Sequence, residues 1–260
     1  GSGNLTVAWN WKAGTTTGID TTGSTITPSD YSFNTTSGFS IVKYTGNAVL
    51  GATVPHGLGV APEFIIVKAT NATESWATGH EYMYSTNPWD YYMYLNSTGA
   101  RNQNNNRFAN VSPTSTVFSI GNDDSVNNSS YTYMAYCFAG KKGYSKFGDY
   151  TGNGVTTDGT FVYTGFRPAW LMLRQAEASG AESWFISDDK RQGFNPLNDH
   201  VYADDTSAEN STGNFVDLLS NGFKIKTVSS SWNGAGKHFI YAAFAEFPFV
   251  SSNSKAGTAR

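Results

Sequence analysis

Four histidines, His56, His80, His200 and His238, are the residues best suited to acid–base chemistry in this 260-residue chain. His56 lies in a glycine-rich corner and predicts a turn residue, whereas His238 directly precedes an apolar segment and is expected to be exposed. None of the four has the spacing of a metalloprotease, a serine hydrolase or a zinc site. The histidines therefore predict no catalytic centre.

Carboxylates could hydrolyse a glycoside if two of them faced each other across the sugar. The candidates are Glu81, Asp90, Glu182, Asp188, Asp189 and Glu209. The sequence places no two of them at a working separation, and loop carboxylates are commonly only solvated. We expect a protein that is not an enzyme, with a polysaccharide-degrading enzyme as one alternative.

Three acidic dipeptides could bind Ca²⁺ together with loop carbonyls: Asp123-Asp124, Asp188-Asp189 and Asp204-Asp205. None has the spacing of an EF-hand or of a calcium-binding repeat, so we predict no metal and no other cofactor. The single cysteine, Cys137, excludes an intrachain disulfide. We interpret it as a small buried residue rather than a nucleophile.

Binding fits these residue types better than catalysis, because aromatic faces and planar polar side chains on loops can hold sugars. Residues 80–107 contain an aromatic cluster and a polar tract, and residues 191–202 contain a second polar group. The candidate ligand-binding residues are His80, Tyr82, Trp89, Tyr91, Arg101, Arg107, Arg191 and Asn195. The alternative is that the alternating Tyr92 and Tyr94 only pack within a strand.

The composition that must position these residues is typical of an all-β protein. Charged residues make up 14% and aromatic residues 15% of the chain, which has 27 glycines. Helix formers are scarce, whereas turn and strand formers are abundant. The net charge of −3 and the lack of a basic patch predict no nucleic-acid partner. The lack of a long apolar run predicts no membrane insertion, and residues 1–14 do not resemble a secretory leader.

The chain is predicted to contain two copies of one unit. Residues 44–47, Tyr-Thr-Gly-Asn, recur as residues 150–153, an offset of 106 residues. Residues 133–139 resemble residues 239–245 at the same offset. Several matches in one order and at one offset indicate a duplication.

Each copy is predicted to be a β-sandwich. The continuous apolar run from Phe64 to Val67 indicates a strand covered on both faces. Phe118 and Ile120, like Phe223 and Ile225, alternate with polar residues and predict strands with one buried face. Short strands separated by Gly, Asn and Pro favour two tandem β-sandwich, jelly-roll-like repeats of about 106 residues.

Residues 7–14 look like the closing strand of a preceding repeat. We therefore expect an extra N-terminal strand and three regions: residues 1–37 (this strand and a linker), 38–142 (repeat one) and 143–260 (repeat two and a C-terminal tail). One explanation is truncation or processing of a longer polypeptide. The other is that residues 4–13 form a strand donated to a neighbouring subunit.

Eight segments carry a likeness to a known family: WNWKAG (9–14), GFSIVKYTGN (38–47), HGLGVAPEFIIVK (56–68), YLNST (94–98), SYTYMAYCFA (130–139), GYSKFGDYTGNG (143–154), FVYTGFRPAWLML (161–173) and SNGFKIKTVSSSWNGAGKHFIYAAFAEFPF (220–249). The first seven resemble a repeat domain of tail-fibre and other virion appendage proteins of marine bacteriophages, and the last resembles the end of that domain. The likeness covers nearly the whole chain, and GYSKFGDYTGNG is quite specific.

This resemblance implies an exterior, host-facing role without catalysis. We expect a tail fibre-like subunit on the virion exterior that is homo-oligomeric, contacts other virion proteins and binds a host surface glycan or receptor, with avidity strengthening weak contacts. One alternative is a self-assembling extracellular filament or capsid decoration protein that uses its N-terminal strand for subunit pairing. Further alternatives are a depolymerase and a non-viral protein built from the same repeat.

Overall fold

Antiparallel β-strands make up most of the regular secondary structure of the described residues, in agreement with the predicted β-rich fold class. The computed structural model describes residues 7–177 and 182–246. Two four-residue helices, α1 (Asp124–Asn127) and α2 (Ser230–Asn233), and a 3₁₀ turn, η1 (Pro88–Asp90), interrupt the strands. Within the described ranges, no helix is long and apolar enough to cross a membrane.

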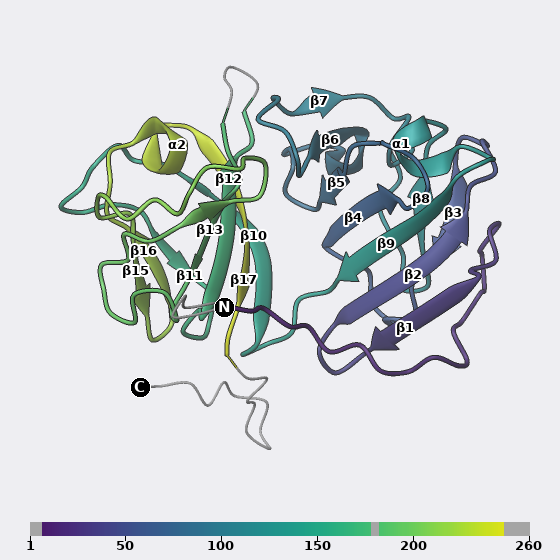
Figure 1. Cartoon of the computed structure of the whole chain (residues 1–260), viewed down its shortest axis with the longest axis horizontal. Coiled ribbons are helices and arrows are strands. Elements are labelled where there is room, and N and C mark those ends of the chain that lie inside the picture. Colours follow the sequence, from purple (N-terminus) through teal and green to yellow (C-terminus); the bar gives the residue numbers. More distant parts are fainter. Residues whose placement is uncertain (1–6, 178–181, 247–260) are drawn as a thin grey trace.

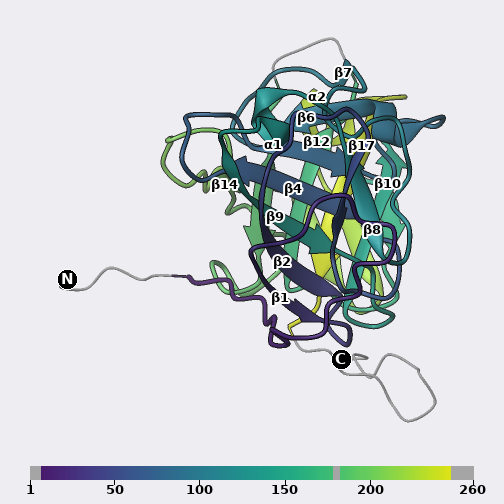
Figure 2. The ribbon, with the colours of Figure 1, turned by 90° about the vertical axis from the view of Figure 1, so that its right-hand side faces the viewer.

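The first half carries a seven-stranded sheet and a two-stranded sheet. The large sheet has the order β1 (Asp30–Asn34), β2 (Phe39–Thr45), β9 (Thr132–Phe138), β4 (Phe64–Ala69), β5 (Ala77–His80), β6 (Tyr91–Tyr94) and β7 (Asn102–Gln103). The small sheet pairs β3 (Ala52–Pro55) with β8 (Val117–Ile120). Figure 2 shows β1, β2, β9 and β4 as successive ribbons of the large sheet.

The second half repeats this arrangement of strands. Its five-stranded sheet has the order β10 (Ser145–Thr151), β17 (His238–Phe244), β12 (Trp170–Gln175), β13 (Phe185–Asp188) and β14 (Val201–Tyr202). Its three-stranded sheet contains β11 (Phe161–Tyr163), β16 (Gly222–Ile225) and β15 (Val216–Leu219). The order β10-β17-β12-β13-β14 matches the order β2-β9-β4-β5-β6 of the first half.

Matched hydrogen bonds recur in the two halves at the offset that the sequence predicts. The buried Tyr44 hydroxyl donates to the carbonyl oxygen of Val126 at 2.7 Å. The buried Tyr150 hydroxyl donates to the carbonyl oxygen of Trp232, also at 2.7 Å. Each tyrosine therefore ties its central sheet to the short helix that covers it.

Apolar residues fill three interiors: one inside each half and a third between the two large sheets. On β4, Ile65 and Val67 face the first-half interior, whereas Phe64 and Ile66 face the second half. The Phe64 ring stacks against Phe147 with centroids 5.9 Å apart. Figure 1 shows the halves side by side, with β3 and β8 on one outer side and β11, β15 and β16 on the other. The prediction that the apolar run of β4 is covered on both faces is confirmed.

Polar contacts also join the halves. The buried guanidinium of Arg174 donates to the carbonyl oxygens of Ser97 at 2.7 Å, Tyr94 at 3.3 Å and Gly99. The Trp184 indole donates to the Tyr94 carbonyl oxygen at 3.0 Å. Burial lowers the pKa of Arg174 to about 10, so the side chain keeps its charge at neutral pH. These directional bonds fix the relative position of the halves.

Residues 7–14, which belong to the described part of the chain, form no strand, so the predicted N-terminal strand is wrong. The Trp11 ring lies 5.3 Å from the Trp170 ring and 5.4 Å from the Phe244 ring. The physical reason is that an extended backbone beside an apolar surface is enough to bury every second side chain. A β-strand also needs backbone hydrogen bonds to a neighbouring strand. The first backbone bridge of this segment is at Thr15.

The same contacts bear on the idea of a donated strand. Residues 4–6 lie outside the described residues, but residues 7–13 run along their own chain, and Trp9, Trp11 and Ala13 pack against the interior between the halves. Figure 1 shows this segment passing from the second half towards β1. Because these apolar side chains are already partly buried against their own chain, we do not propose strand donation.

Candidate ligand-binding site

A pocket of about 470 Å³, here called the junction pocket, lies where the two halves meet. The first half supplies the segment after β5 and Arg101 just before β7, and the second half supplies β10, the segment after β12 and the start of β17. Its aromatic and ionisable lining residues are Glu81, Tyr82, Tyr84, Arg101, Asp149, Glu177 and His238. Because both halves contribute, the pocket depends on their packing.

Two tyrosines present ring surface to this pocket. Tyr82 and Tyr84 are 39% and 37% exposed, which is high for large aromatic side chains. Tyr84 packs against Tyr91 with ring centroids 4.5 Å apart, and the Arg101 guanidinium lies 4.5 Å from the Tyr84 ring centre. Arg101 also donates to the carbonyl oxygen of Met83 at 2.9 Å. The rings and the cation are thus held in place before a ligand arrives.

Three carboxylates lie beside the tyrosines. Glu81 accepts a hydrogen bond from the indole of Trp89 at 2.9 Å. Asp149 lies 3.1 Å from the imidazole of His238, and Glu177 forms another ion pair. Carboxylates fixed in this way can still accept hydrogen bonds through their remaining lone pairs. The pocket therefore combines aromatic faces with acceptors for hydroxyl groups.

The carboxylates also affect neighbouring groups. Burial raises the pKa of the Tyr82 phenol, and the negative charges of Glu63, Asp149 and Glu81 raise it further. Burial likewise raises the pKa of Glu63, and the charge of Glu81 adds to this effect. Tyr82 therefore keeps its proton at neutral pH and can donate a hydrogen bond to a ligand.

The structure brings three of the eight predicted binding residues to this place. Tyr82 and Arg101 line the junction pocket, and Tyr91 lies directly behind Tyr84 and Arg101. The prediction that Trp89 offers its face to a ligand is wrong, because the side chain is 1% exposed. The 3₁₀ turn η1 directs its ring into the first-half interior, where it supports the Glu81 carboxylate instead.

His80 is also buried, so its predicted role in direct binding is wrong. Its Nδ1 accepts a hydrogen bond from the Tyr82 amide at 3.1 Å, and its Nε2 lies 3.2 Å from the carbonyl oxygen of Tyr241. These two partners define the neutral imidazole with the proton on Nε2. Burial lowers the pKa of His80 to about 4. His80 therefore joins the two halves rather than a ligand.

Arg107 is held by its own half and does not line the junction pocket, so its predicted ligand role stays a prediction. Its guanidinium donates to the Tyr94 hydroxyl at 2.7 Å, pairs with Asp123 at 2.9 Å and lies 4.3 Å from the Tyr92 ring centre. The alternative interpretation of Tyr92 and Tyr94, that they pack within a strand, is confirmed. The side chain that looked available in a polar tract completes this packing.

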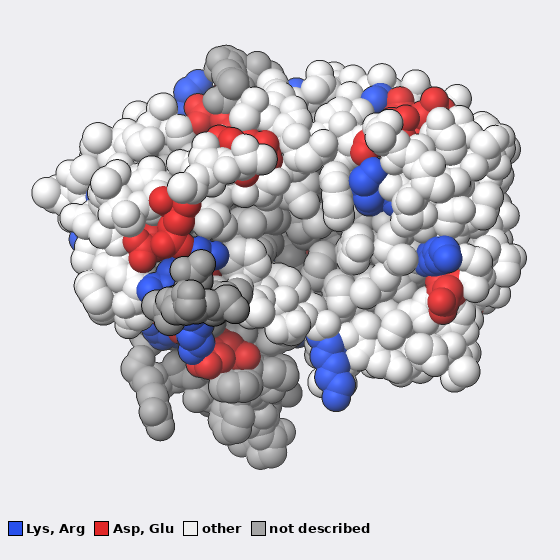
Figure 3. Space-filling model, in the orientation of Figure 1, with Lys and Arg blue, Asp and Glu red and all other residues white. Residues whose placement is uncertain are grey.

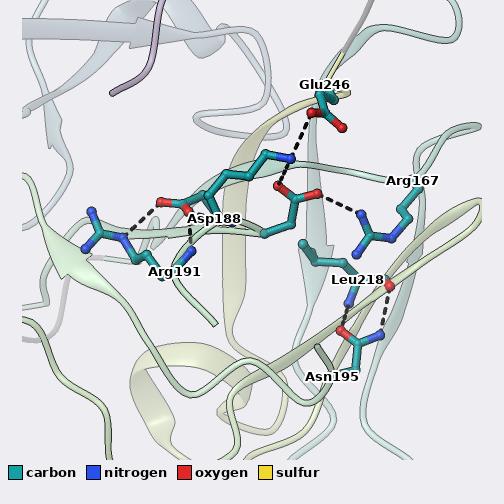
Figure 4. A network of polar contacts seen from close by, with 8 residues as sticks. Arg167, Asp188, Arg191, Asn195, Leu218 and Glu246 are labelled. Atoms are coloured by element: carbon teal, nitrogen blue, oxygen red, sulfur yellow. Dashed lines mark hydrogen bonds and ion pairs between the residues drawn. The ribbon is translucent and has the colours of Figure 1, made fainter. Parts of the chain in front are cut away.

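The two predicted residues of the second half are likewise occupied (Figure 4). Arg191 Nε donates to Asp188 at 2.9 Å, and its guanidinium lies 5.5 Å from the Trp9 ring centre. The Asn195 amide exchanges two 2.9 Å hydrogen bonds with the backbone of Leu218. Both side chains therefore hold loops and the N-terminal segment in place and lie outside the junction pocket, and their role in ligand binding stays a prediction.

The acidic dipeptides have structural partners. Asp123 accepts the amide of Ser125 at 3.0 Å and caps α1, and Asp204 accepts the amide of Trp184 at 2.7 Å. Asp189 pairs with Arg167 at 2.9 Å. In residues 7–177 and 182–246, no three His, Cys, Asp or Glu side chains come together as metal ligands.

Comparison with known proteins supplies a family. The family model for a domain of unknown function, DUF7483, matches residues 1–248. The chain belongs to the DUF7483 family. Comparisons with curated proteins and with solved structures gave no match. The DUF7483 match spans both halves and every residue of the junction pocket.

Sequence reasoning missed part of the pocket in this DUF7483 domain. Tyr84 follows Tyr82 by two residues, and this spacing could have suggested a second exposed ring in an irregular segment. Asp149, Glu177 and His238 carry no such signal, because they belong to separate segments of the second half. Only the packing of the two large sheets brings them to residues 81–101.

Proposed function

We propose that this chain is a non-catalytic, tail fibre-like subunit of a virion appendage, and that its junction pocket binds a host surface glycan. The arrangement of Tyr82 and Tyr84 beside Glu81, Asp149 and Glu177 carries this proposal. Tyrosine rings offer apolar faces to sugar C–H groups, and carboxylates accept hydrogen bonds from sugar hydroxyls. The virion context comes from the sequence resemblance.

The proposed fold is a tandem pair of β-sandwich, jelly-roll-like repeats of about 106 residues. The matching strand orders of the large sheets and the matched Tyr44 and Tyr150 hydrogen bonds support it. We propose repeat one over residues 38–142 and repeat two from residue 143. In this proposal, the pocket arises because two copies pack through their large sheets, so neither repeat would contain it alone.

The charge pattern suits a polar ligand. Figure 3 shows charged side chains as small separate groups of both signs on the face that it draws. We propose an exterior location, a homo-oligomeric assembly with other virion proteins, and no nucleic-acid partner. Several copies in one appendage would strengthen weak glycan contacts through avidity.

The proposal is tested by binding of the purified chain to an array of bacterial capsule and O-antigen oligosaccharides. Tyr84→Ala removes an exposed ring of the pocket, and Tyr163→Ala removes an exposed ring on β11 that lies outside it. We expect Tyr84→Ala to weaken binding about tenfold, which corresponds to about 1.4 kcal/mol. Tyr163→Ala should bind like the parent chain.

Two further measurements separate the alternative functions. Release of new reducing ends from a bound polysaccharide would identify a depolymerase and refute the non-catalytic part of the proposal. Spontaneous polymerisation, without binding to any glycan on the array, would favour the filament or capsid decoration protein. Equal binding by the parent chain and Tyr84→Ala would show that the glycan binds outside the junction pocket.

A further inference from the structure

The second half bears a groove of its own between β14, the loop over residues 203–215 and α2. It consists of two adjoining hollows of about 310 and 510 Å³ that share Ser183, Tyr202 and Asn210. None of its described lining residues belongs to the junction pocket. We call it the second-half groove.

Aromatic rings form the floor of the smaller hollow. The rings of His200 and Phe215 have centroids 4.5 Å apart, and those of Phe215 and Trp232 are 5.1 Å apart. Phe185 packs against Trp232 at 4.7 Å. Hydroxyl and amide groups of the rim surround this floor. The groove therefore has an apolar base and polar walls.

The equivalent place in the first half is filled by an ion pair. There the Arg107 guanidinium lies over Tyr92, donates to the Tyr94 hydroxyl and pairs with Asp123. The side chain of Arg107 is only 13% exposed. One buried arginine thus connects the strand β6 to the start of α1.

Strand register identifies the corresponding residues of the second half. Tyr94 faces Ala77 across β5 and β6, and Tyr202 faces Phe185 across β13 and β14. Tyr202 therefore corresponds to Tyr94, and His200, two residues earlier, corresponds to Tyr92. The Tyr202 hydroxyl lies 3.1 Å from Nε2 of His200 instead of bonding to an arginine.

Phe215 takes the place of Arg107. The carbonyl oxygen of Arg107 accepts the amide of Gly121 after β8, and that of Phe215 accepts the amide of Lys226 after β16, both at 2.8 Å. Phe215 also packs on His200, as Arg107 packs on Tyr92. The replacement removes the long polar side chain that spans this region in the first half.

Ser229 takes the place of Asp123 at the start of the short helix. Asp123 caps α1 with its side chain, whereas Ser229 makes no side-chain capping bond to α2 and lines the groove. In the first half, the ion pair of Arg107 and Asp123 fills this space. In the second half, Phe215 and Ser229 stand in their places, and a hollow remains.

We infer that the second-half groove is a second saccharide-binding site, specific for neutral sugars and independent of the junction pocket. The partly buried ring of Phe215 and the ring of Tyr202 can contact sugar C–H faces. Hydroxyl groups of Ser183, Ser229 and Ser231 can exchange hydrogen bonds with sugar hydroxyls.

The charges of the groove select against acidic sugars. Among the described lining residues there is no lysine or arginine, whereas Glu182, Asp205 and Glu209 are present. A uronate or other acidic sugar would bring a carboxylate to Glu182 and Asp205, whereas Glu209 is already paired with the Arg191 guanidinium, which does not belong to the described lining. A neutral saccharide loses nothing by this arrangement, since its hydroxyls can donate to the carboxylates.

The test uses saturation-transfer NMR and an array that pairs neutral oligosaccharides with uronate-containing ones of the same length. Ser183→Trp places a bulky ring where the two hollows meet. Its matched control is Ser75→Trp, since Glu74-Ser75-Trp76 corresponds to Glu182-Ser183-Trp184 and Ser75 is similarly half-buried. Tyr84→Ala reports separately on the junction pocket.

A second variant fills the groove with the pair of side chains that occupies the equivalent place in the first half. The double substitution Phe215→Arg and Ser229→Asp rebuilds in the second half the pair that Arg107 and Asp123 form in the first. We expect both this variant and Ser183→Trp to weaken neutral-saccharide binding at least about tenfold. Both are compared in a chain that carries Tyr84→Ala, so that the junction pocket does not contribute to the signal, and in that chain Ser75→Trp should leave the neutral-saccharide signal unchanged.

Three results would overturn the inference: no neutral saccharide bound by the parent chain, binding that survives Ser183→Trp, or tighter binding of uronates than of neutral sugars in the groove. If the double substitution unfolds the chain, as a thermal melt would show, Ser183→Trp against Ser75→Trp decides alone. Glycan binding lost only in Tyr84→Ala would support the junction pocket and refute the second-half groove.

Discussion

Acidification should destabilise this protein through two buried neutral histidines. His80 accepts the Tyr82 amide on Nδ1 and faces the Tyr241 carbonyl oxygen with Nε2. His56 has the same pattern: Nδ1 accepts the Leu58 amide at 3.2 Å, and Nε2 faces a carbonyl oxygen at 3.2 Å. In each case a second proton would have to sit on Nδ1, directly against a backbone N–H group. Protonation would therefore break a hydrogen bond and bury a charge.

The magnitude follows from the pKa values. Burial lowers the pKa of both His56 and His80 from 6.5 to about 4. Between these values the unfolded chain binds more protons than the folded chain, so stability falls as the pH drops from 6.5 towards 4. For one such histidine, linkage gives a loss of about 2 kcal/mol between pH 8 and pH 5, and for two independent ones about 4 kcal/mol.

The assay is chemical denaturation followed by tryptophan fluorescence at pH 8, 7, 6 and 5. The parent chain is compared with the double variant His56→Gln and His80→Gln, because glutamine can accept and donate hydrogen bonds but does not titrate in this range. Carboxylates and His200 contribute equally to both chains, so the difference between them isolates the two histidines. The parent should lose about 4 kcal/mol more than the variant over this interval.

The double variant also controls for a general loss of stability, since only the dependence on pH is compared. Parallel stability curves for parent and variant would refute the argument that both imidazoles are neutral and buried. A parent chain that gains stability on acidification relative to the variant would mean that the folded state favours the charged imidazole, which is the opposite sign.

Three further predictions concern contacts between the halves and within them. Arg174→Met should lower the free energy of unfolding by about 2 to 3 kcal/mol, because it removes charge-assisted bonds to three carbonyls, and hydrogen exchange should quicken in residues 94–99. Trp11→Ala should lower the free energy of unfolding by about 2 kcal/mol, because it removes aromatic contacts. Lys12 is exposed, so Lys12→Ala should change the free energy of unfolding by less than about 0.5 kcal/mol; both values are measured by denaturation. Tyr44→Phe and Tyr150→Phe should each cost about 1 kcal/mol, and costs that differ several-fold would contradict equivalent roles in the two halves.

The sequence predicts those parts of the fold that depend on local pattern and on repetition. The offset between Tyr44 and Tyr150 identified two residues with the same hydrogen bond, because a duplicated unit keeps its internal contacts. The apolar run at Phe64 indicated a strand covered on both faces. The pattern could not predict that the second half covers the other face of this strand. Burial periodicity shows that a face is hidden but not which element hides it.

The candidate site was less accessible to sequence reasoning, for a physical reason. Aromatic and polar residues in a loop look alike whether they face a ligand or an interior. Trp89 and Tyr82 come from the same segment, yet one is buried and the other lines the junction pocket. Arg107 looked available until its Asp123 and Tyr94 partners were known. Each outcome depends on contacts between distant segments.

Repetition itself explains why the proposed second-half groove lies where the two halves differ. A contact kept in both halves, such as that of Tyr44 and Tyr150, maintains the fold and is unavailable to a ligand. Where Phe215 replaces Arg107, the fold persists because the backbone hydrogen bond to the next strand is unchanged. Without the arginine side chain a hollow remains, and the surrounding fold already holds its walls in place. Departures from the repeat that preserve the backbone bonds are therefore the positions at which this chain can acquire a ligand without loss of structure.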